Sequence, residues 1–331
     1  MVHYIANIFF ELELENLAGN DLKNALAKNK TLKQLQYLPL LYLTEDDTLL
    51  VTEYPQQSYL DRFNFPLPNI ELIGDVFMGQ KLLSWGASDL ISKWAKDKFA
   101  MPSFSCAKKI NSKLWTFQHV MPLKGAKVIF SQKELEDAVS GTSLNWVLKT
   151  DQGFAGRGNL VFNLKTLNKA LKLVDNHSQN GLILEPWVER ALDFSSQWVI
   201  SKEGEIFLLG ITKCLNTPQG VYSGTEAGPP ALVFGKFLPL VEEHVAYCKN
   251  YLKKVVKEGF YGHLGIDAMV YDRATLHPIV EVNARMTMSA AIFLYHQFHR
   301  ESEVTRIYYS NHDSNKTNLL PDGYQRKLIV M

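Results

Sequence analysis

The sequence predicts an α+β fold whose first domain is of the α/β type. Residues 1–100 mix strand-like and helical stretches, and from about Asn111 short strands, glycine-bearing turns and helices alternate. The segment from Gly265 to Arg285 reads as two arms of alternating polarity around a polar connector, which is typical of an antiparallel hairpin. A chain of 331 residues is long enough for two or three domains.

The composition describes a globular protein. Hydrophobic residues make up 46%, charged residues 21%, and the net charge is +1, so no basic excess favours nucleic acid. No apolar run is long enough to span a bilayer, and the N-terminus lacks the basic region and cleavage site of a signal peptide. The three cysteines are widely spaced, without metal-type pairing. We therefore expect a cytoplasmic protein that binds neither nucleic acid nor membranes; a homodimer stays open.

Residues 1–100 are expected to begin with a strand. A polar helix follows from about Leu22 to Tyr37, then a hairpin-like pair from Leu40 to Tyr54 and a helix from Ser88 to Lys98 with Ser88 as its N-cap. No Gly-x-Gly-x-x-Gly follows a strand here, which excludes a dinucleotide-binding unit. Later helices are predicted over Gln132–Ser140, Thr166–Asp175 and Leu240–Lys257.

The hairpin carries the chain's clearest chemical signal. If its turn centres on Ala274, Asp267 lies opposite Glu281 and shares one face with Asn283 and Arg285. The opposite face is apolar and suited to a core; it comprises Ile266, Ala268, Val270, Val280, Val282 and Ala284.

Two facing carboxylates repel each other unless a divalent cation lies between them. Together with the amide oxygen of Asn283 they are the hard oxygen ligands that Mg²⁺ takes beside substrate phosphates. The alternative is a solvated face on an edge hairpin. Asn is depleted inside strands, and Arg285 falls beside the carboxylates, so the pattern favours metal and phosphate binding.

A glycine-rich turn joins the strand Trp146–Lys149 to the strand Leu160–Phe162. Glycines let backbone N–H groups approach an anion closely, and Lys149 would add a charge for phosphate. The turn lacks the Gly-Lys-Ser/Thr of a P-loop. The alternative is an ordinary β-turn. The turn contains Gly153, Gly156, Arg157 and Gly158.

A buried strand ends at Glu185, where Pro186 stops regular pairing and leaves backbone groups free to bind the edge of a planar ring. Glu185 could accept a hydrogen bond from an exocyclic amine, and Glu189 could bind sugar hydroxyls. An acidic turn is the alternative. Lys213 ends a further apolar strand, as Lys149 does, and could instead be an exposed strand terminus.

In this order the segments resemble the ATP-grasp superfamily, and within it the carboxylate–amine ligases, over roughly Asn111 to Gln297. The resemblance implies two α+β subdomains that clasp ATP. It assigns residues 1–100 to a pre-grasp domain, 101–180 to a small subdomain with the glycine-rich loop, and 181–331 to a large subdomain with the metal site.

The resemblance also implies residue roles. Lys149 would contact the α- and β-phosphates, Glu185 the adenine amino group and Glu189 the ribose. Arg285 would bind the transferred phosphate and the acyl intermediate, and Lys213 would reach the γ-phosphate. Further nucleotide contacts would come from Lys113, Gly153, Gly156, Arg157, Gly158, Trp187, Val188 and Asp193. The Mg²⁺ ligands would be Asp267, Glu281 and Asn283. For the upstream lysine, Lys98 and Lys127 stay open beside Lys113.

The activity implied is ligation of a carboxylate to an amine with ATP and Mg²⁺, for which Mn²⁺ could substitute. An acyl phosphate would form, and ADP and phosphate would leave. The partners would be small molecules, the carboxylate being an amino acid or small carboxylic acid. Two alternatives remain: a kinase-like phosphotransferase, and a non-catalytic nucleotide-binding regulatory protein. Residues 1–100 resemble no family, so the sequence does not name the substrate.

Overall fold

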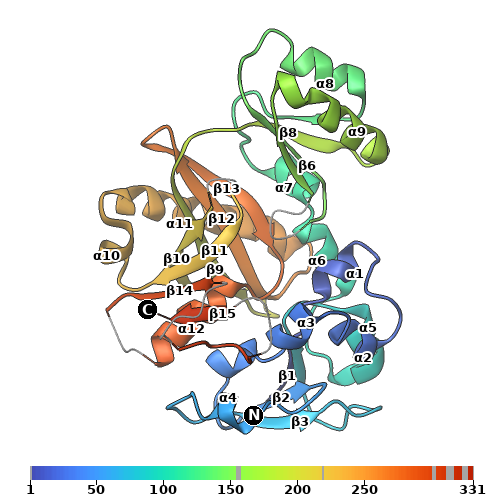
Figure 1. Cartoon of the computed structure of the whole chain (residues 1–331), viewed down its shortest axis with the longest axis vertical. Helices are drawn as coiled ribbons and strands as arrows, with labels where there is room; N and C mark the ends of the chain where they lie inside the picture. Colours follow the sequence, from blue (N-terminus) through green and yellow to red (C-terminus); the bar gives the residue numbers. More distant parts are fainter. Residues whose placement is uncertain are drawn as a thin grey trace.

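The computed structural model describes residues 2–153, 158–217, 220–299, 303–310, 317–322 and 327–330. These residues form three β-sheets with flanking helices. In Figure 1 the small region that carries α8 and α9 lies at the top and the N-terminal region lies at the bottom. The largest sheet lies between them.

The N-terminal region contains a parallel four-stranded sheet in the order β3-β2-β1-β4, which agrees with the expected α/β class. Its strands are β1 (His3–Ile5), β2 (Thr48–Val51), β3 (Asn69–Leu72) and β4 (Leu82–Ser84). Its helices are α1 (Phe10–Leu14), α2 (Leu22–Leu26), α3 (Lys30–Leu35), η1 (Leu38–Leu41), α4 (Gln57–Leu60), α5 (Asp89–Ala95) and η2 (Lys96–Lys98).

Two predictions for this region are wrong. The helix expected from Leu22 to Tyr37 is divided, because the Asn29 side chain accepts a hydrogen bond from the Leu32 amide and begins a second helix. The hairpin expected after Leu40 does not form, since η1 occupies its first arm and β2 pairs in parallel with β1. The N-cap at Ser88 is confirmed: its hydroxyl lies 3.2 Å from the Ile91 amide nitrogen.

The small region is an antiparallel sheet in the order β5-β8-β6-β7, with two helices packed against it. Its elements are β5 (Lys127–Ile129), α8 (Gln132–Val139), β6 (Trp146–Lys149), β7 (Asn159–Phe162), η3 (Leu164–Thr166), α9 (Leu167–His177) and β8 (Leu182–Pro186). Because β8 pairs with β5 and β6, the boundary expected after residue 180 falls one strand too early.

The large region is an antiparallel seven-stranded sheet in the order β13-β12-β9-β10-β11-β14-β15. The strands are β9 (Arg190–Ile200), β10 (Ile206–Asn216), β11 (Tyr222–Ala227), β12 (Gly262–Tyr271), β13 (Thr275–Asn283), β14 (Thr305–Ser310) and β15 (Lys327–Val330). Its helices are α10 (Pro230–Phe234), η4 (Gly235–Phe237), α11 (Leu238–Lys257) and α12 (Met288–Phe298).

Helices α6 (Phe104–Asn111) and α7 (Lys113–His119) also pack on the large region, whereas the resemblance implied a small subdomain over residues 101–180. Ala107 and Trp115 share a core with Trp198 of β9 and Tyr251 of α11. Burial against the large sheet therefore decides their place.

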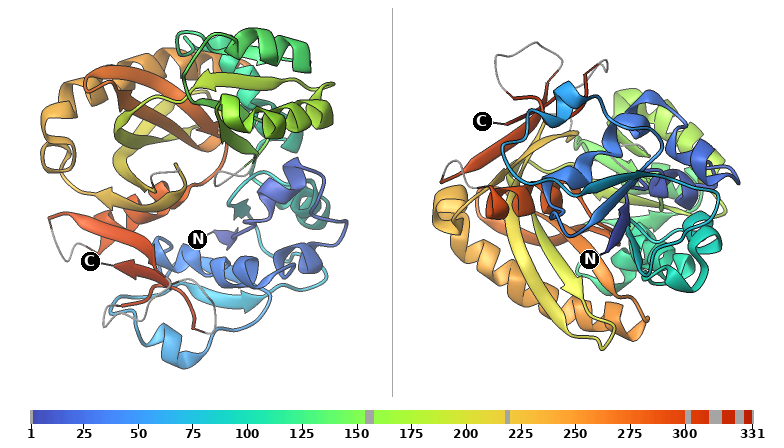
Figure 2. Two further views of the ribbon diagram at one scale, coloured as in Figure 1. Left: turned by 45° about the horizontal axis from the view of Figure 1, so that its top comes forward. Right: turned by 90° about the horizontal axis from the view of Figure 1, so that it is seen from below.

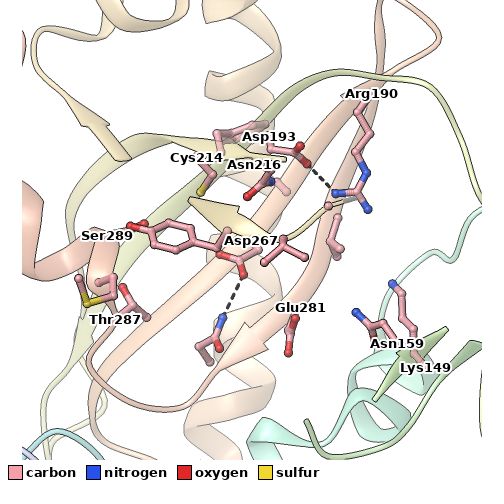
Figure 3. A pocket seen from close by; sticks show the side chains of 18 of the residues that line it. Lys149, Asn159, Arg190, Asp193, Cys214, Asn216, Asp267, Glu281, Thr287 and Ser289 are labelled. Atoms are coloured by element: carbon pink, nitrogen blue, oxygen red, sulfur yellow. Dashed lines mark hydrogen bonds and ion pairs between the residues drawn. The ribbon is translucent and has the colours of Figure 1, made fainter. Parts of the chain in front are cut away.

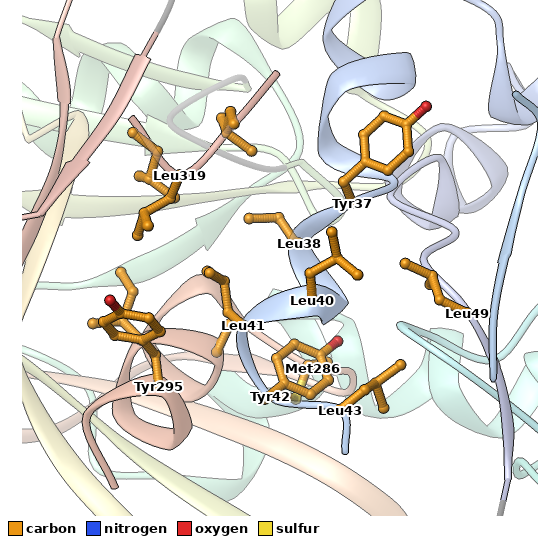
Figure 4. Packing of buried hydrophobic residues seen from close by; sticks show 14 of the residues in the cluster. Tyr37, Leu38, Leu40, Leu41, Tyr42, Leu43, Leu49, Met286, Tyr295 and Leu319 are labelled. Atoms are coloured by element: carbon orange, nitrogen blue, oxygen red, sulfur yellow. The ribbon is translucent and has the colours of Figure 1, made fainter. Parts of the chain in front are cut away.

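One hydrophobic core joins the N-terminal region to the large region. Leu38, Leu41 and Leu49 pack in it with Tyr295 of α12 and Leu319 near the C-terminus (Figure 4). Figure 2 shows the C-terminal strands beside the N-terminal elements. Burial of this shared apolar surface holds the two regions against each other. In the part of the chain that the structure describes, no helix is both long and apolar enough to cross a membrane.

Candidate active site

The predicted pairing of the hairpin is confirmed. Asp267 of β12 is the partner of Glu281 of β13, and Gly265 pairs with Asn283. The Asn283 amide nitrogen donates to an Asp267 carboxylate oxygen over 3.1 Å. The two carboxylates and the amide therefore occupy neighbouring positions on one face of the sheet, as their alternation indicated.

The turn itself lies one residue earlier than expected. Tyr271 pairs with Thr275, so the connector centres on Arg273, and Asp272 and Arg273 adopt φ values of 46° and 73°. A register shift between Asp267 and Met269 compensates for this difference. Such a bulge places extra residues on one strand and restores the opposition of Asp267 and Glu281 beyond it.

The bulge also corrects the expected apolar face. Strict alternation predicts that Val280 belongs to the apolar face. Instead, Ile279 is buried in the core and Val280 lines the pocket described below. Pro278 in the bulge has no backbone N–H to donate. Its carbonyl oxygen lies 2.7 Å from Nδ1 of His244 on α11. Burial lowers the pKa of His244 to about 4, so a neutral ring holds the bulge in place.

A pocket with a volume of about 500 Å³ opens above this face, between the large sheet and the small one. Figure 3 shows Lys149 and Asn159 at one end, Thr287 and Ser289 at the other, and Asp267 between them. Seven predicted site residues line the pocket. They are Lys149, Trp187, Asp193, Asp267, Glu281, Asn283 and Arg285.

Asp267 is the pocket carboxylate whose pKa is perturbed. Burial, reinforced by the charge of Glu281, raises the pKa of Asp267 to about 6. The remaining polar partners are close: Lys113 Nζ lies 2.9 Å from a Glu281 oxygen, and Arg285 donates to Asn283 Oδ1 over 3.0 Å. Two carboxylates and an amide oxygen fit the donor set of Mg²⁺, and a divalent cation would relieve the repulsion between Asp267 and Glu281.

Of the three candidate upstream lysines, Lys113 reaches this site. It is buried at the start of α7, and its ammonium also donates to the Gly153 carbonyl over 3.0 Å. The Asp151 carboxylate accepts from the Leu114 amide and ties the helix to the glycine-rich loop. Lys98 instead forms an ion pair with Asp97 at the surface. Nucleotide contact by Lys113 stays a prediction.

Lys149 and Glu185 form a buried ion pair between β6 and β8. Lys149 Nζ lies 2.6 Å from the Glu185 carboxylate, with only 9% and 10% of the two side chains exposed. This burial argues against the acidic turn that was the alternative for Glu185. Burying two charges is costly unless they are paired, so each residue requires the other in the absence of a ligand.

The glycine-rich loop is described at its two ends. The backbone of Gly158 has φ +81°, and a Cβ atom there would lie 2.1 Å from the Thr150 hydroxyl, so the hairpin requires glycine at this position. Thr150 in turn donates its amide to the Gly158 carbonyl over 2.9 Å. Gly156 and Arg157 lie outside the described residues.

Lys213 is a correction. It lies inside β10, which continues to Asn216, and its ammonium is 2.9 Å from the Glu226 carboxylate. Neighbouring Cys214 lines the pocket, and because side chains alternate along a strand, Lys213 points to the other face of the sheet. The prediction that Lys213 reaches the γ-phosphate is therefore at odds with the structure.

The segment around Glu189 enters the pocket only in part. Neither Glu189 nor Val188 is among the residues that line the pocket, whereas Asp193, four residues beyond Glu189, is. The Glu189 carbonyl accepts from the Asp272 amide over 3.1 Å, which ties this segment to the hairpin turn. A contact of this segment with a sugar stays a prediction.

Sequence reasoning missed one residue of the pocket and one residue that contacts the pocket lining. Arg190 forms an ion pair with Asp193 over 3.1 Å, and its guanidinium lies 4.9 Å from the centre of the Trp187 ring. The position of Arg190 between Glu189 and Asp193, two predicted nucleotide contacts, could have identified it as a residue of the pocket. Glu11 of α1 forms an ion pair with Arg285. No local pattern pointed to Glu11, because its partner comes from the other end of the chain.

Known structures resemble this architecture. Phosphoribosylamine–glycine ligase from Thermotoga maritima aligns over 99% of this chain and 89% of its own, with a TM-score of 0.60 and 9% identity. An ADP complex of N5-carboxyaminoimidazole ribonucleotide synthetase aligns over 100% and 91%, with a TM-score of 0.57 and 12% identity. This chain has the ATP-grasp fold. The ATP-grasp likeness extends to biotin carboxylase from Campylobacter jejuni, with a TM-score of 0.56 and 15% identity over 97% of this chain and 77% of that one.

Among curated proteins, a [butirosin acyl-carrier protein]–L-glutamate ligase from Niallia circulans is 26% identical over 284 residues, which is 75% of this chain. This chain spans 63% of that relative's length. No protein-family model matches this chain.

Proposed function

We propose that this protein is an ATP- and Mg²⁺-dependent ligase that joins a carboxylate to an amine. The observation that carries the proposal is the arrangement of Asp267, Glu281 and Asn283 beside Arg285 in one pocket, with Lys149 at its far end. Solved proteins of the same fold were crystallised with ADP and with MgADP, which supports a nucleotide in this pocket.

The residues present fit a nucleotide. Lys149, which is paired with Glu185, would provide a positive charge, the Trp187 ring an apolar surface, and Asp193 an acceptor for sugar hydroxyls. Asp267, Glu281 and Asn283 would hold Mg²⁺, which supplies charge neutralisation for the phosphates when bound. The volume of about 500 Å³ lies within the range of small-molecule sites.

The chemistry requires positioning more than a protein nucleophile. A carboxylate does not react with an amine at neutral pH, since its leaving group would be an oxide. Transfer of the γ-phosphoryl group would turn it into an acyl phosphate, which an amine can attack. Arg285 and Lys113 would offset the negative charge at the transferred group. Exclusion of water from the pocket would keep the acyl phosphate from being hydrolysed.

For the substrate we propose the carboxylate of an amino acid. The name of the curated relative states L-glutamate and an acyl-carrier protein for that protein. L-Glutamate is therefore the first carboxylate to test here, with small amines and an acyl-carrier protein as acceptors.

The test is a screen for ADP formation from ATP and Mg²⁺ with pairs of carboxylates and acceptors. ADP release that depends on the acceptor supports the ligase. ADP release with accumulation of a phosphorylated acid and no need for an acceptor indicates the kinase-like alternative. Binding of MgATP without turnover in any mixture indicates the regulatory protein.

The metal assignment has its own variant. We expect Glu281→Gln to lower Mg²⁺-dependent turnover about a hundredfold or more, because it removes one charge from the metal site. Glu136→Gln is the matched control, since Glu136 is exposed on α8 in the small region. Circular dichroism should report the same fold for both variants. Wild-type turnover by Glu281→Gln would contradict the metal site.

A further inference from the structure

Arg285 is held by protein groups along three parts of its guanidinium. Nη2 donates to Asn283 Oδ1 over 3.0 Å, and Nη1 donates to the Met286 carbonyl over 3.0 Å. Nε forms the ion pair with a Glu11 carboxylate oxygen. A guanidinium has five N–H groups. One N–H on each terminal nitrogen is thus not used by these contacts and is left for a carboxylate or phosphate.

The backbone around Arg285 is held by segments outside the large sheet. The Met286 amide donates to the Trp85 carbonyl over 2.7 Å, and the Ala284 amide donates to Asn111 Oδ1 over 3.1 Å. Gly86 bridges to Arg285 and exchanges two hydrogen bonds with the Asn7 side chain. The N-terminal region therefore fixes the main chain of Arg285 as well as its Nε edge.

Glu11 itself cannot be a ligand-binding residue in this arrangement. Its side chain is 6% exposed, and it is not among the residues that line the pocket, whereas Arg285 is. Burying a carboxylate is costly unless a partner compensates its charge, and Arg285 is the ionic partner of Glu11. Its effect on a bound molecule must pass through Arg285.

We propose that Glu11 is a positioning residue, which orients the Arg285 guanidinium so that its two unused N–H groups face the pocket and grip the phosphoryl or acyl group in transit. The inference rests on the proposed function for the identity of that group. It gives the N-terminal region a share in catalysis, in addition to its packing against α12.

Glu13 provides the matched control on the same helix. It is buried as well, and its carboxylate accepts from the Leu90 amide over 3.1 Å, within the N-terminal region. Glu11→Gln and Glu13→Gln are therefore the same isosteric change in two buried positions of α1. The difference between them is that Glu11 contacts Arg285, whereas Glu13 binds the Leu90 amide.

The first measurement needs no substrate. In protein with isotope-labelled arginine, the Nε–H signal of Arg285 is assigned by its loss in Arg285→Gln, and its exchange with solvent is followed by NMR. We expect faster exchange in Glu11→Gln and wild-type exchange in Glu13→Gln. Unchanged exchange in Glu11→Gln would overturn the ion pair and the proposal with it.

The second measurement uses the substrate pair found by the screen for ADP formation. We expect Glu11→Gln to lower kcat about tenfold or more, since small misplacements of a positioning group are costly, while the KM for MgATP changes less than about threefold. In the Arg285→Gln background, Glu11→Gln should lower kcat by less than about a further twofold, because the side chain through which Glu11 acts is absent. An equal loss in both backgrounds, or a similar loss in Glu13→Gln, would show a structural role and overturn the proposal.

The two hypotheses fail separately. If the wild-type protein turns over no substrate pair, the proposed function fails while the exchange measurement still reports the Glu11–Arg285 contact. If turnover occurs and Glu11→Gln keeps the wild-type kcat, the positioning role fails and the ligase assignment stands.

Discussion

The two faces of the large sheet place carboxylates in opposite electrostatic settings. On the far face, burial alone would raise the pKa of Glu226, but Lys213 and Arg306 hold it below its usual value. On the pocket face, Asp267 opposes Glu281, and burial raises the pKa of Asp267 to about 6.

The two carboxylates differ in whether the protein itself supplies their counter-charge. Glu226 has its cations within the protein and needs no ligand, so its cluster supports the sheet. Asp267 faces another carboxylate and an amide, and a cation from solution would improve its surroundings. A perturbed carboxyl in a pocket is a candidate for function for this reason. Lys149 and Lys213 differ in place only: both follow apolar runs and both are paired within the protein, but Lys149 lines the pocket and Lys213 does not.

The largest effect is expected from Lys149→Met. The substitution leaves the Glu185 carboxylate buried without its cation, and breaking a buried pair costs about 3–5 kcal/mol. It also removes a phosphate contact, so we expect MgATP binding to weaken by about a hundredfold. Denaturant unfolding and calorimetric titration measure the two effects. The double variant Lys149→Met/Glu185→Leu should recover stability but not binding; recovered binding would contradict the pocket role of Lys149.

The second effect is a pH dependence on the pocket face. A proton on Asp267 competes with Mg²⁺, so we expect Mg²⁺-dependent nucleotide binding to weaken by about tenfold per pH unit below pH 6. The same group affects stability with a defined sign. Its folded pKa lies above the unfolded value, so the folded state binds the proton more tightly, and stability is lost as pH rises from about 4 to about 6.

The matched variant for this dependence is Asp267→Asn. The difference in unfolding free energy between wild type and variant, measured without metal, should change between pH 4 and 6 in the direction given and stay constant above it. A constant difference across that range would remove the basis for the electrostatic contrast between the two faces. Burial and the Glu281 charge would then not govern Asp267.

The smallest effect is expected from Lys213→Met on the far face. The Lys213 side chain is 34% exposed and Glu226 keeps Arg306, so screening limits the loss of stability to about 1 kcal/mol or less. We expect kcat and the KM for MgATP to change less than about threefold. Steady-state kinetics would compare kcat and KM of Lys213→Met with those of Lys149→Met. A large loss of turnover in Lys213→Met would show that Lys213 reaches the pocket in a conformation other than the one described.

Local sequence patterns predicted much of the site because they depend on neighbours along the chain. The alternation around Asp267 and Glu281 identified the correct face, and Lys149, at the end of its strand before a glycine turn, was placed correctly. The same reasoning failed at Lys213, since an apolar run does not show where its strand ends. Cys214, one position further along, lines the pocket instead, because successive side chains of a strand point to opposite faces of the sheet.

The sequence by itself determined the hairpin, the oxygen-donor set and the resemblance to ATP-grasp ligases, because alternation and glycine turns follow from local backbone geometry. Only the tertiary structure decided that Lys113 reaches Glu281, that Arg190 flanks Trp187 and that Glu11 holds Arg285. These contacts join residues far apart in the chain. They depend on the burial that brings three sheets together, and no local period encodes that arrangement.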